Sequence, residues 1–337
     1  MAGEAVLVIG PSWVGDMILA QSLFKALKQR NPAVEIDVAA PAWTLPLLER
    51  MPEVRHGIPL PFRHGRLDLM QRIRIGRELR GNAYAQAILL TNSFKSAIVP
   101  FCADIPHRTG FLGEFRHGLL NDIRPLDEQR LPMTVQRFVA LGLARGENLP
   151  DSLPYPELAA SSTQAAAILE TLGRGMPKTP VLGLCPGAEY GSAKRWPEEH
   201  YAAVATWALD LGWEVWLFGS GKDAAVTGEI NRHADGRCLD LGGKTSLAEA
   251  IDLMSLTTAV VSNDSGLMHL AAALDRRLVA IYGSSDPGHT PPMSDKATIQ
   301  HLGLECSPCF KRECPLGHLR CLRDIPPETV IRHLQPL

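Results

Sequence analysis

The second half of the chain carries four short polar loops, and each directly follows an apolar run that predicts a buried strand. The loops span residues 186–189, 219–223, 262–266 and 283–287. In open parallel sheets, the loops at the carboxyl ends of the strands border the ligand crevice. Two cations, Lys194 and Arg195, follow the first of these loops. The combination predicts a binding site for a nucleotide diphosphate.

The loop 262–266 joins an apolar strand to an Ala-rich helix. Asp264 and Ser265 are favoured residue types at helix amino termini, and Gly266 leaves the backbone accessible to a ligand. Free N–H groups and the positive end of the helix dipole favour an anion at such a joint. A capped turn without a ligand has the same composition, so this stretch alone fits both a binding site and a structural turn.

The end of the chain concentrates four of the seven cysteines, at Cys306, Cys309, Cys314 and Cys321. A C-x-x-C pair followed by two further cysteines can supply four thiolates to a tetrahedral Zn²⁺. The later spacing is not a second close C-x-x-C pair, so free thiols and disulfides remain alternatives. If a metal binds this tail, 306–321, we expect it to be structural.

The composition limits the class of protein. A length of 337 residues predicts two domains, and 45% hydrophobic with 21% charged residues is typical of a globular protein. A net charge of −2 and a pI of about 6.6 argue against a nucleic-acid partner. The amino terminus lacks the features of a signal peptide, and no apolar run reaches the roughly 18 residues of a membrane-spanning helix. We therefore expect a cytoplasmic protein with at most peripheral membrane contact.

The elements that would position these loops alternate between strand and helix, which predicts an α/β fold with parallel sheets. In the first domain, 1–155, we expect a strand at 6–10, a loop at 11–16, a helix at 17–30 and strands at 34–39 and 87–90. The Pro-rich stretch 149–156 predicts a stiff connector. In the second domain, 156–337, we expect a helix at 161–172 and strands at 181–185, 213–218, 257–261 and 278–282.

The first strand–helix turn does not carry a dinucleotide-binding motif. Gly10 and Gly15 are separated by four residues, which departs from the G-x-G-x-x-G pattern. The strand 34–39 is followed by Ala40 and Pro41 and not by an acidic residue. Both observations argue against an NAD-dependent dehydrogenase.

Seven segments together resemble the ADP-heptose:lipopolysaccharide heptosyltransferases, over most of the chain from about residue 6 to residue 292. The segments are 10–16, 40–43, 91–97, 105–110, 185–191, 193–197 and 262–269. The resemblance implies a GT-B fold, with two Rossmann-like domains facing across a cleft. It implies inverting transfer of L-glycero-D-manno-heptose from ADP-heptose, held by the second domain, to an acceptor held by the first.

The implied acceptor is heptosyl-Kdo₂-lipid A, modified at its first heptose at the cytoplasmic face of the inner membrane of Gram-negative bacteria. Only the overall resemblance of the sequence distinguishes this step from the first or third heptose transfer. A sugar-nucleotide epimerase and a sugar-phosphate binding protein without activity are the alternatives from other classes.

The resemblance assigns the chemistry to Asp16 and Lys194. Asp16 lies at the family's carboxylate position and would be the general base, although its spacing equally fits an N-cap of the helix expected from Met17. Lys194 would stabilise the leaving diphosphate without a metal, so we expect no cofactor for the chemistry. A surface lysine is the plain alternative, and Arg195 is a weaker second cation.

The remaining donor contacts are expected around the same loops. Asp264 would bind heptose or ribose hydroxyls, because a carboxylate repels a diphosphate. His269, one helical turn after Ser265, is either a ligand contact or a core histidine. Asp223 would accept from the ribose or lie solvated in its turn, and Thr245 would border the adenine. The expected donor set is Gly187, Lys194, Arg195, Asp223, Thr245, Asp264, Ser265, Gly266 and His269.

The acceptor carries carboxylates and phosphates, so basic residues in the first domain are candidates for its binding. Arginines crowd residues 63–80, where a solvated helix face is the alternative reading. The expected acceptor set is Arg63, Arg66, Arg72, Lys95, Arg108 and Arg116.

Overall fold

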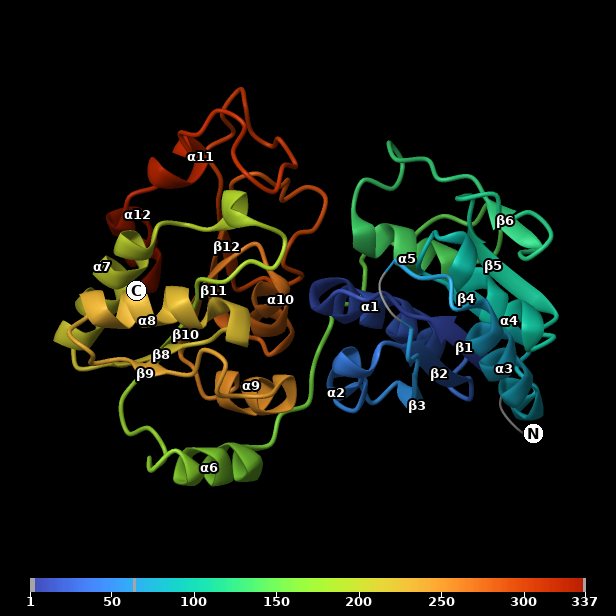
Figure 1. Cartoon of the computed structure of the whole chain (residues 1–337), viewed down its shortest axis with the longest axis horizontal. Helices are drawn as coiled ribbons and strands as arrows, with labels where there is room; N and C mark the ends of the chain where they lie inside the picture. Colours follow the sequence, from blue (N-terminus) through green and yellow to red (C-terminus); the bar gives the residue numbers. More distant parts are fainter. Residues whose placement is uncertain (1–3, 63–64, 336–337) are drawn as a thin grey trace. The chain divides into compact units, whose positions relative to one another are not determined.

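The structure, a computed structural model, describes residues 4–62 and 65–335. The chain divides into two compact units, Met1–Glu157 and Leu158–Leu337 (Figure 1). The Pro-rich connector 149–156 ends at this boundary. Among the described residues, no helix is long and apolar enough to cross a bilayer.

The first unit is built on one sheet whose six described strands are all parallel, in the order β3-β2-β1-β4-β5-β6. The strands are β1 (Ala5–Ile9), β2 (Glu35–Ala40), β3 (Val54–Pro59), β4 (Gln86–Leu89), β5 (His107–Phe111) and β6 (Asp122–Arg124). Its helices are α1 (Val14–Arg30), α2 (Leu45–Leu48), α3 (Leu69–Leu79), α4 (Ile98–Cys102) and α5 (Thr134–Gly142).

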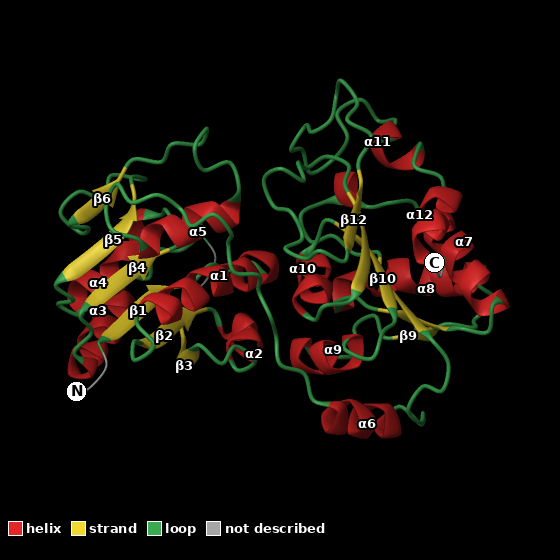
Figure 2. Ribbon diagram, turned by 180° about the vertical axis from the view of Figure 1, so that it is seen from behind, coloured by secondary structure: helices red, strands yellow, loops and turns green. Residues whose placement is uncertain are grey.

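The sheet of the first unit is covered by helices on both faces (Figure 2). Leu7, Ile9 and Leu89 share a buried cluster with α3 and α4, whereas α1 packs against α5. Such a strand, buried on both faces, reads as a continuous apolar run, which is why 6–10 was recognisable in the sequence.

The second unit repeats the same topology. Its six described strands are also parallel, in the order β12-β11-β10-β7-β8-β9. The strands are β7 (Val181–Cys185), β8 (Glu214–Leu217), β9 (Leu239–Asp240), β10 (Ala259–Asn263), β11 (Arg277–Ile281) and β12 (Ala297–Gln300). Its helices are α6 (Ser162–Thr171), α7 (Glu198–Asp210), α8 (Ala224–His233), α9 (Leu247–Met254), α10 (Gly266–Ala273), α11 (Arg320–Arg323) and α12 (Pro327–Leu334). Renumbered within each unit, both sheets have the order 3-2-1-4-5-6 of dinucleotide-binding folds.

Two element boundaries differ from the sequence predictions in ways that matter for the site. Helix α1 begins at Val14, with Trp13 as its N-cap, so Asp16 lies in the first turn of the helix and not in the preceding loop. The structural alternative for Asp16, an N-cap of this helix, therefore does not hold, and its role as the general base stays a prediction. Strand β10 ends at Asn263, two residues later than expected, so Ser262 and Asn263 belong to the strand.

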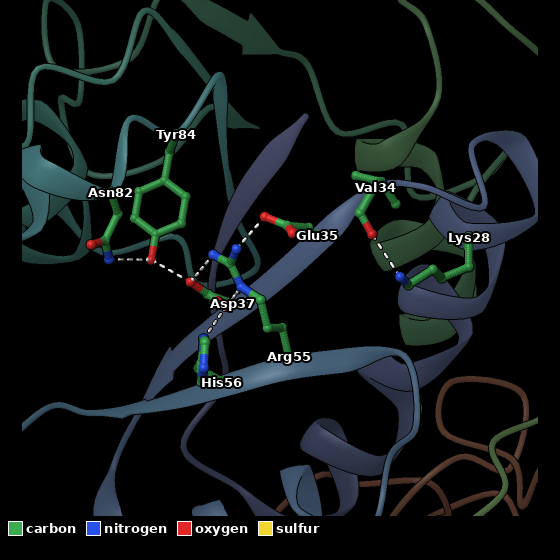
Figure 3. A network of polar contacts seen from close by, with 8 residues as sticks. All are labelled: Lys28, Val34, Glu35, Asp37, Arg55, His56, Asn82 and Tyr84. Carbon is green, nitrogen blue, oxygen red and sulfur yellow. Dashed lines mark hydrogen bonds and ion pairs between the residues drawn. The ribbon is translucent and has the colours of Figure 1, made fainter. Parts of the chain in front are cut away.

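A buried polar network joins β2, β3 and the segment before β4 (Figure 3). Asp37 accepts two hydrogen bonds from the guanidinium of Arg55, at 2.9 and 2.7 Å, and one from the Tyr84 hydroxyl at 2.6 Å. His56 adds a contact at 3.2 Å. Burial raises the pKa of the Asp37 carboxyl, but the hydrogen bonds from Arg55 and Tyr84 outweigh it, so the pKa lies below its ordinary value. The network therefore holds a charged carboxylate inside the unit.

Helix α3 lies directly on the backbone of α4. At Gly76 of α3, a Cβ atom would lie 2.6 Å from both the carbonyl oxygen of Val99 and the Cβ of Cys102. Glycine is therefore required for this approach, which leaves Arg74 and Arg77 on the exposed side of α3.

Candidate functional site

The carboxyl edge of the second sheet gathers a lysine, an aspartate and a serine. Lys194 ends the short 3₁₀ turn Ser192–Lys194, and its Nζ atom lies 2.5 Å from Oδ2 of Asp264. The same oxygen of Asp264 accepts a hydrogen bond from the hydroxyl of Ser285 in the loop after β11. The Asp264 side chain is only 5% exposed, so it is fixed between these two donors. The ammonium of Lys194 is thus placed at the start of α10.

Asn263 connects the loops around this group to β10. Its side-chain oxygen accepts from the backbone N–H of Trp196 and from the hydroxyl of Tyr201, both at 3.0 Å. Its amide nitrogen donates to the carbonyl of Pro186 at 2.6 Å. All of these groups are buried, so one side chain holds the loop after β7 and the end of the Lys194 turn.

The amino terminus of α10 is not closed by a side chain. Ser265 occupies the N-cap position but makes no side-chain capping hydrogen bond. The first N–H groups of the helix and its dipole therefore favour an anion beside Lys194.

His269 lies buried within the first turns of α10. Burial lowers the pKa of its imidazole to about 4; the nearby Asp264 raises it and Lys194 lowers it. The ring is therefore neutral at pH 7. Its Nδ1 atom is buried and has no hydrogen-bond partner among the described residues.

Three further predicted donor residues, Gly187, Arg195 and Asp223, come together at the next loops, and Thr245 lies in the loop beside them. A Cβ atom on Gly187 would lie 2.4 Å from Cγ of Asp223, so glycine is needed for this approach. Asp223 accepts from the N–H and hydroxyl of Ser220, at 2.9 and 2.7 Å, and lies 4.0 Å from Arg195. Thr245 follows Gly243, whose N–H bonds to the carbonyl of Gly219 at 2.9 Å. These loops therefore form one continuous edge.

In the first unit, Asp16 is half-buried in the first turn of α1. The loop before it follows Gly10, where a Cβ would lie 2.7 Å from Cε, the flexible end of Met17. The indole N–H of Trp43 donates to the carbonyl of Ser12 at 3.0 Å and joins this loop to the segment after β2. Asp16 thus lies at the carboxyl edge of the first sheet, where the loops after its strands meet.

A model of glycosyltransferase family 9 (heptosyltransferase) matches residues 72–320. The chain belongs to glycosyltransferase family 9. It is 47% identical to the Lipopolysaccharide heptosyltransferase 2 of Salmonella typhimurium, over 98% of each chain. It is 46% identical to the Lipopolysaccharide heptosyltransferase 2 of Escherichia coli, again over 98% of each chain.

Two solved structures of heptosyltransferases match the fold of this chain. The structure of E. coli ADP-heptose lps heptosyltransferase II matches with a TM-score of 0.87 at 44% identity, covering 98% of this chain and 97% of that one. The E. coli heptosyltransferase WaaC with ADP matches with a TM-score of 0.72 at 20% identity, covering 98% of each chain. The predicted GT-B fold class and glycosyltransferase family are confirmed.

Two of the basic residues expected at the acceptor are buried inside this glycosyltransferase and bond to its backbone. The guanidinium of Arg116 is buried and donates to the carbonyls of Thr91, at 2.7 Å, and Phe111. Arg72 is also buried, and donates to the carbonyls of Leu67 and Lys95 at 2.6 and 3.1 Å. These arginines brace the loops after β3, β4 and β5.

The other expected acceptor residues differ in exposure. Arg108 is half-buried and donates to the carbonyl of Leu119 at 2.6 Å. Arg66 is exposed and Lys95 half-buried, so their contact with an acceptor stays a prediction. Arg63 lies outside the described residues.

The candidate site contains residues to which the sequence analysis assigned no role. Asn263 lies inside the motif 262–269 and Ser285 inside the polar loop 283–287, so position alone could have suggested both. Tyr190 places its ring 5.3 Å from Nζ of Lys194, within range of a cation–π contact. Its position in the motif 185–191 was the available signal.

The seven cysteines are all free thiols in the structure. Four of them, Cys306, Cys309, Cys314 and Cys321, line one cavity. Burial raises the pKa of the Cys314 thiol, but backbone N–H groups directed at its sulfur outweigh this, and the pKa lies below its ordinary value. The cysteines of the tail are thus neighbours in space.

Proposed function

We propose that this glycosyltransferase moves L-glycero-D-manno-heptose from ADP-heptose to the first heptose of the lipopolysaccharide inner core. The observation that carries the proposal is the Lys194–Asp264–Ser285 group at the open amino terminus of α10. It occurs in a chain that aligns end to end with lipopolysaccharide heptosyltransferases 2 at 46–47% identity. The acceptor is heptosyl-Kdo₂-lipid A.

The reaction is a single in-line displacement. An acceptor hydroxyl oxygen forms a bond to the anomeric carbon as the bond from that carbon to the β-phosphate oxygen breaks, which inverts the anomeric centre. Asp16 takes the hydroxyl proton, and ADP departs with the bonding electron pair. Lys194 and the N–H groups of α10 stabilise the charge that develops on the diphosphate. No cofactor enters these steps.

Asp264 has a positioning role in this scheme. Because its carboxylate is held by Ser285, it fixes the ammonium of Lys194 in direction before the donor binds. When the diphosphate arrives, Lys194 interacts with both anions. Asp223 then accepts hydrogen bonds from the ribose hydroxyls, and Thr245 borders the adenine. The neutral His269 and Asp264 face the heptose.

The acceptor is lipid-anchored and anionic, so we propose peripheral contact with the inner face of the inner membrane. Arg66 and Lys95 contact the acceptor's carboxylates or phosphates. Arg72 and Arg116 brace the loops that carry these two residues, and Arg108 braces the loop before β6. Exposed apolar residues, Leu67, Leu69 and Met70, accompany the basic residues and suit a lipid interface.

The test is incubation of the enzyme with ADP-heptose and truncated core acceptors, followed by mass spectrometry. We expect one added heptose on an acceptor that already carries one, and none on Kdo₂-lipid A. Addition to Kdo₂-lipid A would assign the first transfer instead. Turnover of ADP-heptose without any acceptor would support an epimerase.

A further inference from the structure

The segment 306–321 has no regular secondary structure before α11, yet it lies against the donor loops. Its four cysteines line a cavity of about 20 Å³ together with Ala193 and Ser284. A long segment without helix or strand has no core of its own, so another interaction must order it.

The cavity has the features of a thiolate site. Four thiols and one buried hydroxyl lie in its wall. The hydroxyl of Ser284 is 1% exposed and has no hydrogen-bond partner among the described residues. This hydroxyl therefore has a hydrogen bond left to make at the wall of the cavity.

The ligand set can be narrowed. His318 also lines the cavity, but its Nδ1 atom accepts a hydrogen bond from the backbone N–H of Arg320 at 3.0 Å. With Nδ1 as the acceptor, the proton of the neutral imidazole is on Nε2, so neither ring nitrogen has a free lone pair for a metal. The four sulfurs remain as the complete set for a tetrahedral ion.

We propose that Cys306, Cys309, Cys314 and Cys321 bind one thiophilic transition-metal ion, with Zn²⁺ as the expected occupant. A closed site of four thiolates leaves no open coordination position, so the ion is structural. Among the described residues, no group of three or more His, Cys, Asp or Glu side chains is already arranged to hold a metal ion. Binding therefore draws the four sulfurs from the wall of their shared cavity onto one centre and releases the thiol protons.

The ion would also hold the Lys194 turn. The N–H of Ala193 donates to the carbonyl of Arg312 at 3.0 Å, and the hydroxyl of Tyr190 donates to the carbonyl of Phe310 at 2.9 Å. A Cβ on Gly191 would lie 2.3 Å from that same Arg312 oxygen, so the two backbones are in direct contact. An ordered 306–321 segment is thus a support for the turn that ends at Lys194.

The site is tested by titrating the metal-free, reduced, full-length protein with Co²⁺. We expect one Co²⁺ per chain, with the thiolate charge-transfer band and the visible bands of tetrahedral cobalt, and loss of these bands when Zn²⁺ is added. Cys309→Ser and Cys321→Ser should lose the bands, whereas Cys102→Ser, in the first unit, should keep them. Absence of the bands in the unsubstituted protein, or their persistence in both serine variants, would overturn the proposal.

The support of Lys194 is tested separately by the affinity for ADP, with circular dichroism as a check on folding. Removing the metal should weaken ADP binding severalfold in the unsubstituted protein and have little effect in Lys194→Ala, because the two changes act through one group. Equal weakening in both proteins would overturn the supporting role. The ADP-affinity test rests on the proposed nucleotide site, whereas the cobalt titration does not. A failure of the metal proposal can therefore be distinguished from a failure of the proposed function.

Discussion

Lys194 is held by a buried carboxylate before any substrate binds. A lysine on an exposed loop samples many rotamers, but the 2.5 Å contact with Asp264 limits Lys194 to a narrow range. Fixing a cation beforehand lowers the entropy lost when it meets the diphosphate. The ion pair therefore prepares the site, although Asp264 carries the same sign of charge as the donor.

Asp16 is the residue on which the proposed chemistry depends most. We expect Asp16→Ala to lower kcat by about 10²–10⁴-fold, the usual range for loss of a general base. The affinity for ADP should be unchanged, because ADP is proposed to bind residues of the second unit. Transfer assays and calorimetry on the same preparation measure both. Normal transfer by Asp16→Ala would remove this residue from the mechanism.

Asn263 is the second residue to examine, because its side chain makes three hydrogen bonds to groups on separate loops. Asn263→Ala leaves those buried partners unsatisfied, at about 1–3 kcal/mol for each group without a substitute. We expect weaker ADP binding and a lower midpoint of thermal unfolding. A lower unfolding midpoint with unchanged ADP affinity would show that Asn263 only stabilises the fold.

At the scale of elements, the Asp37 network holds β2, β3 and the start of β4 together. Asp37→Asn breaks the paired hydrogen bonds with Arg55, and we expect a loss of about 2–3 kcal/mol, below the range for fully buried pairs because the Arg55 side chain is 32% exposed. Asp104→Asn is the control, since its 2.9 Å pair with Arg80 is exposed on both sides and contributes little. Urea unfolding of both variants measures the difference.

The same network predicts a dependence on pH. The pKa of Asp37 is lower in the folded protein than in the unfolded chain, so its contribution is fully present above the unfolded pKa of about 4. The contribution is lost as the pH falls from there through the folded pKa. Below pH 4, the unsubstituted protein should therefore lose stability faster than Asp37→Asn. Parallel curves of the unfolding free energy against pH for the two proteins would contradict the lowered pKa of Asp37.

The elements themselves were largely predictable, and the exceptions have physical causes. Strand β7 was predicted to the residue because its five apolar residues are all buried. Helix α1 begins before the predicted residue because Gly15 is buried inside the helix, where packing outweighs its low helix propensity. Strand β10 includes Ser262 and Asn263 because distant groups satisfy the Asn263 side chain.

The candidate site was predictable only in part. Asp264 and Lys194 were recognisable because they lie in motifs, and the structure brings them into contact. The burial of Arg116 was not predictable, because a count of arginines does not show which guanidinium groups bond to backbone carbonyls. The contact of Ser285 with Asp264 depends on strand order, which places β11 directly beside β10.

At the scale of the whole molecule, binding of ADP should raise the stability of the protein. A ligand at 100 times its Kd stabilises the folded state by about 2.7 kcal/mol. We expect Lys194→Ala to reduce the resulting rise in Tm. Lys296→Ala is the matched control, because Lys296 also pairs with an aspartate, Asp275 at 2.5 Å, but at the amino edge of the same sheet. A reduced rise in both variants would show a general effect of charge and not a nucleotide site.

The contact at Gly76 offers a way to change the direction of the arginine side chains on α3 without changing their charge. Because the backbone of α4 lies where a side chain at Gly76 would project, Gly76→Ala must lift or roll α3 while every arginine remains present. Most experiments on basic surfaces delete a cation and so change the field and the geometry together. Here a single methyl group re-aims Arg74 and Arg77, shifts the buried Arg72 of the same helix and leaves the net charge at −2, so a loss of acceptor affinity in the folded variant would report geometry and not charge.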